Sequence, residues 1–151
     1  MMRRFLNPKG FTLIELLIAV AIIGIMMGIV VVKVVGYLEE TRINATKAQI
    51  GNLESALKLY YIKCTRYPST EQGLDALITN PTIGTPCKNY PPGGFLEKNA
   101  IPMDPWDNPY QYELPGRNNP DRYDIGSWGK DGESGTDDDI GNWAAPEQPN
   151  E

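Results

Sequence analysis

The sequence predicts an α+β fold in which a long N-terminal helix packs on a small antiparallel β-sheet. Three observations lead to this prediction. Residues 16–32 contain no charged or strongly polar side chain, apolar side chains then recur at helical spacing as far as Tyr60, and the second half is rich in Pro, Gly, Asn and Asp. With 151 residues, the chain has room for one domain of ordinary size. We therefore expect a helix with a membrane half and an amphipathic half, followed by one globular head.

The charge distribution excludes several functions. Of the 14 basic residues, Arg3, Arg4 and Lys9 precede residue 11, whereas none of the 19 acidic residues does, so the rest of the chain is more acidic than the overall charge of −5. An acidic body is a poor partner for phosphates, and we expect no nucleic acid to bind. The chain has no histidine, which removes the commonest general base and the commonest zinc ligand.

The N-terminal apolar run predicts a membrane-spanning helix. About 20 residues cross the hydrocarbon of a bilayer, and the run from Phe11 to Val32 is long enough. The basic residues before it are expected to stay in the cytoplasm, which places the C-terminal body outside the inner membrane. We therefore assign residues 11–35 to a single membrane helix and residues 36–151 to a periplasmic head.

Glu15 is the unusual residue of this run. A carboxylate in an apolar segment is costly unless it is paired or protonated, and no basic residue lies three or four positions away. A cut just before Phe11 would create an α-amino group that supplies the missing positive charge. An ordinary signal-peptidase cut after Ala21 is the alternative, but the apolar run continues to Val35, and Glu15 would interrupt the signal core.

The residues around Glu15 point to a family. The segment Lys9-Gly10-Phe11-Thr12-Leu13-Ile14-Glu15 resembles the class III signal of type IV pilins and type II secretion pseudopilins. The resemblance implies that a prepilin peptidase removes residues 1–10 by cutting between Gly10 and Phe11, and then methylates the amino group of Phe11. It also implies that Glu15 neutralises the amino terminus of a neighbouring subunit while a filament assembles.

The apolar pattern after the membrane segment predicts that the helix continues to about Tyr61. Apolar residues recur at spacings of three, four and seven with polar residues between them, which places them on one face. No proline occurs between Phe11 and Arg66. The apolar positions are Ile43, Ile50, Leu53, Ala56, Leu57 and Tyr60. We expect this face to form the floor of the head.

Turn and strand signals predict the rest of the head. Ser69 and Gln72 fit a capping box, so a short helix is expected to follow them and to end at Asn80-Pro81. Residues 110–114 and 123–128 have the composition of strands, with the turn-rich residues 115–121 between them. These two strands are expected to pair in the antiparallel sheet.

Cys64 and Cys87 leave two alternatives, a disulfide or two unrelated buried thiols. Zinc would need more soft ligands than the chain has. Export of the head favours the disulfide, since disulfides persist in oxidising compartments. Such a bond would contribute about 2–4 kcal/mol to the free energy of unfolding.

Three blocks in the second half narrow the family resemblance. Residues 67–74, 104–110 and 139–143 resemble the major pseudopilin of type II secretion, whereas type IV pilins generally lack these blocks. The resemblance implies a homo-oligomeric helical filament in the periplasm. It grows on an inner-membrane assembly platform with minor pseudopilins and helps move folded proteins across the outer membrane. A type IV pilin for attachment or motility is the alternative within the class.

Two other classes of function fit less well. An enzyme would need a carboxylate pair. The segments Asp104-Pro105 and Asn119-Pro120-Asp121, however, are turn sequences, where acids are usually solvated, and they hold two of the four candidate acids of the head. The four candidate acids are Asp104, Asp107, Asp121 and Asp124. A monomeric binding module on a membrane stalk could use the aromatic residues of the head, most of which are better placed in a core. We therefore expect a structural protein without catalytic residues.

Residues 131–139 contain five acids and two glycines. Their spacing does not fit an EF-hand, and charge alone favours a solvated acidic turn over a cation site. The family resemblance reverses this preference, because major pseudopilins bind calcium in this loop. The implied Ca²⁺ ligands are the side chains of Asp131, Asp138 and Asp139 and the backbone carbonyls of Trp128 and Thr136, with Asp137 as the alternative to Asp138.

Overall fold

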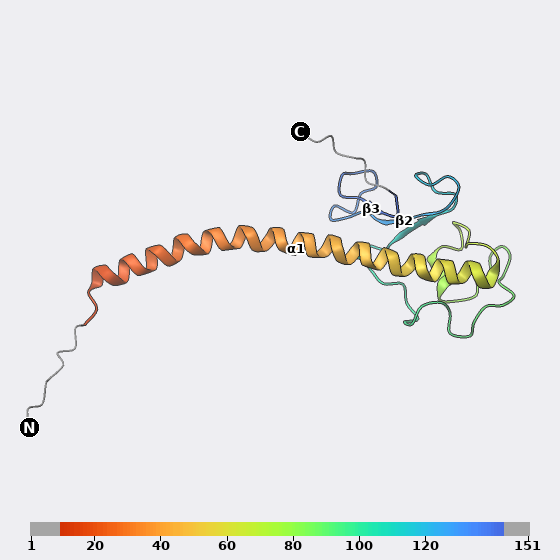
Figure 1. Cartoon of the computed structure of the whole chain (residues 1–151), viewed down its shortest axis with the longest axis horizontal. Helices are drawn as coiled ribbons and strands as arrows, with labels where there is room; N and C mark the ends of the chain where they lie inside the picture. The colour runs from red at the N-terminus through yellow and green to blue at the C-terminus, as the bar shows by residue number, and fades with distance from the viewer. Residues whose placement is uncertain (1–9, 144–151) are drawn as a thin grey trace, which may run out of the picture. The chain divides into compact units, whose positions relative to one another are not determined.

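The computed structural model describes residues 10–143, with the side chains of all of them except residues 28–34. Along the chain it contains helix α1 (Leu13–Cys64), the 3-10 helix η1 (Leu74–Leu77) and strands β1 (Gln111–Glu113), β2 (Asp124–Ser127) and β3 (Ile140–Gly141) (Figure 1). The predicted α+β class is confirmed. The chain divides into two compact units after Glu40. Of the predicted leader, only Gly10 lies among the described residues.

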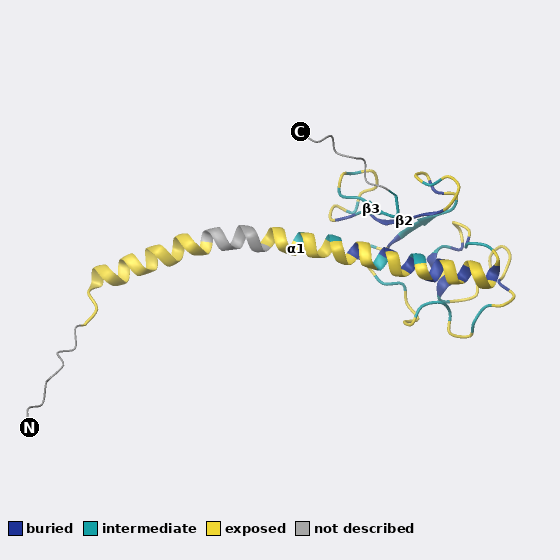
Figure 2. Ribbon diagram, viewed as in Figure 1, coloured by how far each residue is buried: buried dark blue, intermediate teal, exposed yellow. Residues whose placement is uncertain are grey.

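In the N-terminal unit, α1 exposes its apolar side chains. Phe11 is 91% exposed, and every large apolar side chain from Leu13 to Met27 is more than half exposed (Figure 2). Continuous apolar surface of this kind marks an interaction surface for lipid or protein. Part of the span predicted over residues 11–32 falls on residues 28–34, whose side chains are not described.

Among the described residues, no helix combines the length and the hydropathy that a bilayer crossing requires.

In the second unit, α1 buries the face that the sequence predicts. Five of the six predicted side chains are buried, and Ile43 is half-buried. Thr46 is also fully buried, which the apolar pattern did not predict. Its hydroxyl donates to the backbone carbonyl of Arg42 (2.9 Å), so this polar group is satisfied within the helix. The same hydrophobic core includes Leu74 and Leu77 of η1, Tyr110, Tyr123, and Ile125 of β2.

The sheet has three antiparallel strands in the order β1-β2-β3. Residues Gln111 and Gly126 are partners in the β1–β2 pair, and Ser127 and Ile140 are partners in the β2–β3 pair. The two predicted strands are confirmed, although both are shorter than predicted. The sequence analysis missed β3, which has two residues and lacks an alternating apolar pattern.

The predicted capping box is present, but the helix after it differs from the prediction. The side-chain carbonyl of Gln72 accepts the N–H of Ser69 (3.0 Å), and the N–H of Gln72 donates to the Ser69 hydroxyl (3.3 Å). The helix that follows is a single 3-10 turn, η1, and ends at Leu77, before the predicted end at Asn80-Pro81. The reason lies at Gly73, whose φ of 58° turns the backbone away from an α-helical path.

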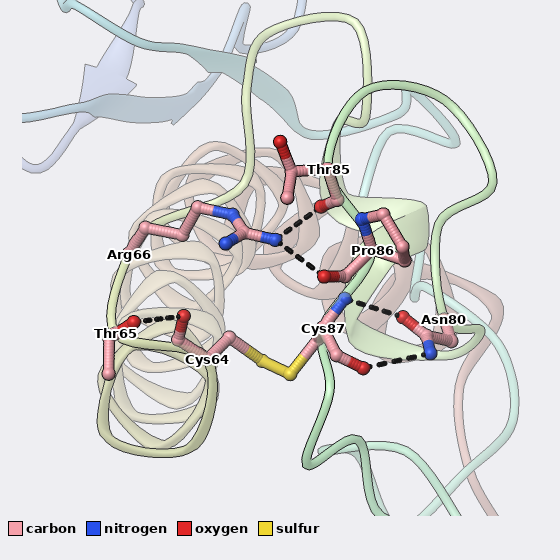
Figure 3. Close-up of a disulfide and its surroundings, with 7 residues drawn as sticks. All are labelled: Cys64, Thr65, Arg66, Asn80, Thr85, Pro86 and Cys87. Carbon is pink, nitrogen blue, oxygen red and sulfur yellow. Dashed lines mark hydrogen bonds between the residues drawn. A yellow bond between two sulfur atoms is a disulfide. The ribbon is translucent and has the colours of Figure 1, made fainter.

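A disulfide joins Cys64, the last residue of α1, to Cys87 (Figure 3). The helix ends there because Thr65 takes a φ of 61°, while its N–H still bonds to the carbonyl of Tyr61 (2.7 Å). Of the two alternatives for the cysteines, the structure contains the disulfide.

Side chains hold the backbone around this disulfide. The amide of Asn80 donates to the carbonyl of Cys87 and accepts its N–H, both at 3.1 Å. The guanidinium of Arg66 donates to the carbonyls of Thr85 and Pro86 (Figure 3). The loop before Cys87 is therefore fixed to the end of α1 by both covalent and hydrogen bonds.

Candidate functional site

The predicted processing and assembly residues lie at the start of α1. Gly10 and Phe11 are exposed and precede the first helical residue. The N–H and the hydroxyl of Thr12 both donate to Oε2 of Glu15 (3.0 Å each), and the N–H of Glu15 donates back to the Thr12 hydroxyl (3.3 Å). This arrangement is a capping box. The sequence analysis overlooked it, although the spacing Thr-x-x-Glu predicts it.

The capping box changes the account of Glu15. The sequence analysis considered only a basic partner for its carboxylate and found none nearby, whereas Thr12 supplies two hydrogen bonds to one of its oxygens. No ion pair to Glu15 occurs among the described residues. The carboxylate is therefore hydrogen-bonded locally but still without a cationic partner.

The acidic loop connects β2 to β3. Trp128 directly follows the last residue of β2, and Asp139 directly precedes the first residue of β3. Because Ser127 and Ile140 are paired across the sheet, the two ends of the loop lie at the same end of the sheet. The strand pairing thus brings predicted ligands from both ends of the loop into one region.

Asp138 accepts hydrogen bonds with both carboxylate oxygens. Its Oδ1 accepts the hydroxyl of Thr136 (2.6 Å), and its Oδ2 accepts the backbone N–H groups of Lys130 (2.7 Å) and Asp131 (3.1 Å). These bonds, that of Thr136 first, lower the pKa of Asp138 because they favour its charged form. Asp138 therefore joins the beginning of the loop to its end.

Asp131 and Asp139 each retain an oxygen for another partner. Oδ1 of Asp131 accepts the N–H of Glu133 (2.8 Å), and Oδ2 of Asp139 accepts the N–H of Gly135 (2.7 Å). Oδ1 of Asp139 is buried and has no hydrogen-bond partner among the described residues. A buried carboxylate oxygen without a partner is costly, so this atom has an unused capacity to accept a bond.

Glycine permits the close packing of this loop. Gly129 has a φ of 63°, and a Cβ there would lie 2.4 Å from the carbonyl oxygen of Asp138. The oxygen-rich, anionic donors suit a hard cation such as Ca²⁺. Within the part of the chain that the structure describes, however, no three acidic, His or Cys side chains are already gathered around one metal position. Asp137, the alternative ligand, is exposed.

The four acids considered for an enzyme differ in their burial. Asp104 and Asp124 are buried, at 4% and 7% exposure, so the expectation of a solvated turn acid is wrong for Asp104. Asp104 accepts the N–H groups of Trp106 and Asn108 from its own turn, in the manner of an Asx turn. Asp124, the first residue of β2, accepts the N–H groups of Asn118 and Asn119 from the turn before the strand. Asp107 and Asp121 are exposed, as the sequence analysis expected of the turn acid Asp121.

The aromatic residues of the head lie mainly in its core. Tyr60, Tyr110 and Tyr123 are buried, and rings of Tyr67 and Tyr112 pack against that of Tyr123 at centroid distances of 4.8 and 5.7 Å. Burial and the nearby Asp104 carboxylate raise the pKa of Tyr110 to about 12. Burial, then the charge of Glu54, raises the pKa of Tyr123 to about 12.

Comparison with protein-family models identifies the family of the chain. A family model described as "Type II secretion system (T2SS), protein G" matches residues 33–143. The match includes the buried face of α1, all three strands and the acidic loop. The chain belongs to the protein G family of type II secretion systems. A second model, described as a prokaryotic N-terminal methylation motif, matches residues 6–31 and therefore includes Gly10, Phe11 and Glu15.

Individual members of the protein G family are similar over most of their length. The type II secretion system core protein G of Aeromonas hydrophila is 45% identical over 137 residues, which cover 91% of this chain and 93% of the relative. The core protein G of Pseudomonas aeruginosa is 43% identical over 138 residues, which cover 91% of this chain and 96% of the relative. The chain thus matches these proteins along nearly their whole sequence.

A solved structure of this family has the same fold. The crystal structure of the major pseudopilin from the type 2 secretion system of enterohaemorrhagic Escherichia coli matches 72% of this chain and 87% of that chain. The two are 39% identical, with a TM-score of 0.65. The prediction of a major pseudopilin in preference to a type IV pilin is confirmed for this protein G family member.

Proposed function

We propose that the mature chain is the structural subunit of a periplasmic filament, the pseudopilus of a type II secretion system, and has no enzymatic role. A prepilin peptidase cuts between Gly10 and Phe11 and methylates the amino group of Phe11. The helix then holds the subunit in the inner membrane, with one crossing and the head in the periplasm, until it joins the filament. The filament, with minor pseudopilins and the assembly platform, helps move folded proteins across the outer membrane.

The exposed apolar surface between Phe11 and Met27 is the observation that best supports this proposal. Lipid can cover this surface before assembly, and the same segment of other copies can cover it afterwards. Glu15 suits the second state. Thr12 occupies its Oε2, which leaves Oε1 for the amino terminus of a neighbouring copy.

Imaging of filaments from cells that produce the chain with its secretion components tests the proposal. The wild-type chain is expected to form filaments, and its mature form is expected to begin with N-methylated Phe11 by mass spectrometry. The variant Glu15→Ala is expected to be processed and inserted in the membrane but to form no filaments. Normal filaments from Glu15→Ala would contradict the assembly role, since only a stalked monomer should tolerate this change.

We further propose that the acidic loop binds one Ca²⁺ as a structural ion. The side chains of Asp131, Asp138 and Asp139 and the carbonyls of Trp128 and Thr136 would hold it. The bound ion would offset the repulsion among adjacent carboxylates and stabilise a loop with few apolar side chains. The unpartnered Oδ1 of Asp139 is the structural observation that supports this site.

Thermal unfolding of the full-length chain in detergent, with calcium or with a chelator, tests the ion. Calcium is expected to raise the melting temperature of the wild type and not that of Asp138→Ala. The neighbouring variant Asp137→Ala is the matched control, because it removes the same charge from an exposed position and should keep the increase. Equal melting temperatures of the wild type with calcium and with chelator would contradict the calcium site. If only Asp137→Ala lost the increase, Asp137 and not Asp138 would be the calcium ligand.

A further inference from the structure

The block Asp104–Asn108 precedes the acidic loop by some twenty residues but is bonded to its beginning. Asp104 is buried, and both of its carboxylate oxygens accept hydrogen bonds. Its Oδ1 accepts the backbone N–H groups of Trp106 (2.9 Å) and Asn108 (2.8 Å). Its Oδ2 accepts the hydroxyl of Ser127, the last residue of β2. The carboxylate thus joins its own turn to the end of the central strand.

Ser127 transmits this contact into the loop. Its hydroxyl donates to Asp104, which orients the oxygen so that it can accept the backbone N–H of Gly129 (3.1 Å). That N–H belongs to the same planar peptide unit as the carbonyl of Trp128. Because the N–H and C=O of a trans peptide point in opposite directions, fixing the N–H of Gly129 also fixes the direction of the Trp128 carbonyl.

Asn108 holds the next peptide unit. Its side-chain amide donates to the carbonyl of Gly129 (3.0 Å). Gly129 itself is confined, since it lies against Asp138 too closely to carry a Cβ. The peptide units on both sides of Gly129 are therefore bound, directly or through Ser127, to the block that Asp104 organises.

We propose that Asp104 is a positioning residue for calcium binding, which acts through Ser127 to aim the Trp128 carbonyl. The inference rests on the calcium site proposed above and assigns a role to the block Asp104–Asn108. Its basis is the hydrogen-bonded chain from Asp104 through Ser127 to Gly129. Groups that orient metal ligands without touching the ion commonly change metal affinity 10- to 100-fold when they are removed.

Asp124 offers a matched control for this role. It is a buried aspartate on β2, the strand that ends at Ser127. Its carboxylate accepts the backbone and side-chain N–H groups of Asn118 and Asn119 at 2.7–3.1 Å. These partners lie in the turn that precedes β2 and not in the loop that follows it. Replacement of Asp124 should therefore destabilise the head without disturbing the Trp128 carbonyl.

Calcium titration of the full-length chain in detergent tests the proposal, with affinity measured by calorimetry and stability measured by melting in chelator. Asp104→Asn and Ser127→Ala are expected to weaken calcium binding roughly 10-fold or more. Asp124→Asn is expected to lower the melting temperature in chelator and to keep the wild-type calcium affinity. Ser127→Ala is the smaller change and decides the matter if Asp104→Asn does not fold without calcium.

The outcomes separate this proposal from the calcium site itself. A wild-type chain that binds no calcium would contradict the site. Wild-type affinity in Ser127→Ala or in folded Asp104→Asn, alongside a wild type that does bind, would overturn only the positioning role. An equal loss of affinity in Asp124→Asn would also overturn it, because the effect would then follow from general destabilisation.

Discussion

Thr12 and Glu15 form a reciprocal pair at the first turn of α1. The N–H and hydroxyl of Thr12 each lie 3.0 Å from Oε2 of Glu15, and the N–H of Glu15 lies 3.3 Å from the Thr12 hydroxyl. Glu15 therefore has two roles to distinguish, an N-terminal cap and an assembly charge. A cap requires only an acceptor oxygen, whereas an ion pair requires a negative charge.

The variant Glu15→Gln separates the two roles. Its side-chain carbonyl can still accept from Thr12, as in the Ser/Thr-x-x-Gln form of the capping box, but it carries no charge. We expect Glu15→Gln to be processed and helical yet to form no filaments, as for Glu15→Ala. Electron microscopy of sheared cells measures assembly, and mass spectrometry confirms processing. Filaments from Glu15→Gln but not from Glu15→Ala would show that the cap, and not the charge, is what assembly needs.

The disulfide is expected to stabilise the head measurably. Replacement of both Cys64 and Cys87 by Ser should lower the free energy of unfolding by about 2–4 kcal/mol, because the reduced unfolded chain gains conformational freedom. Urea denaturation of the full chain in detergent, followed by near-ultraviolet circular dichroism, measures the difference. A reducing agent should destabilise the wild type and leave the double variant unchanged. Equal free energies of unfolding of wild type and variant would show that the disulfide does not stabilise the head.

Local patterns predicted much of the fold because they reflect contacts within one element. The apolar spacing from Ile50 to Tyr60 predicted the buried face of α1, and the spacing of Ser69 and Gln72 predicted their reciprocal hydrogen bonds. Strand β3 was missed because its two residues are held by pairing with β2, a contact between distant segments. Thr46 was missed for the opposite reason, since its hydroxyl is satisfied within the helix and so tolerates burial.

The candidate site was predictable in its residue types but not in its connections. The five acids of residues 131–139 indicated a cation loop or a solvated turn. No sequence pattern indicated that Asp138 would accept N–H groups within the loop or that Asp104 would bond to Ser127. Those contacts depend on how the sheet brings separate turns together. Buried acids such as Asp104 are consequently hard to distinguish from solvated ones in the sequence alone.

Alkaline pH is expected to destabilise the head through its buried tyrosines. The pKa values of Tyr110 and Tyr123 are raised from 10.0 to about 12 in the folded chain. Above pH 10 the unfolded chain releases these protons while the folded chain retains them, so the free energy of unfolding falls as pH rises from 10 to 12. It is unaffected by these groups below pH 10. Urea denaturation over this pH range measures the fall.

Tyr123→Phe is the control for this pH dependence. It removes one of the tyrosine hydroxyls whose pKa is raised in the head and should make the loss of stability between pH 10 and 12 shallower. Ultraviolet absorbance of the tyrosinate should show the same change as a smaller late titration step. An unaltered pH dependence in Tyr123→Phe would mean that other groups cause the alkaline loss.

Gly126 should be intolerant of any side chain. It lies in β2 opposite Gly141 of β3, and a Cβ there would come within 2.7 Å of both the carbonyl oxygen of Ile140 and the ring of Trp143. The strand backbone cannot move away without breaking its pairing on either side. We therefore expect Gly126→Ala to lower the free energy of unfolding by about 1–3 kcal/mol, as overpacking usually does. Urea denaturation with tryptophan fluorescence detects both the loss and any displacement of Trp143.

Gly51→Ala is the matched control for that substitution. Gly51 is exposed on α1, and a Cβ there would meet nothing within 4 Å. Alanine in a helix interior is more favourable than glycine by about 0.5–1 kcal/mol, so this variant should be slightly more stable than the wild type. The same chemical change thus has opposite signs at the two positions, because only Gly126 is covered by a neighbouring strand and an indole ring. Stabilisation by Gly126→Ala would show that Trp143 and β3 do not pack on β2 as closely as the structure places them.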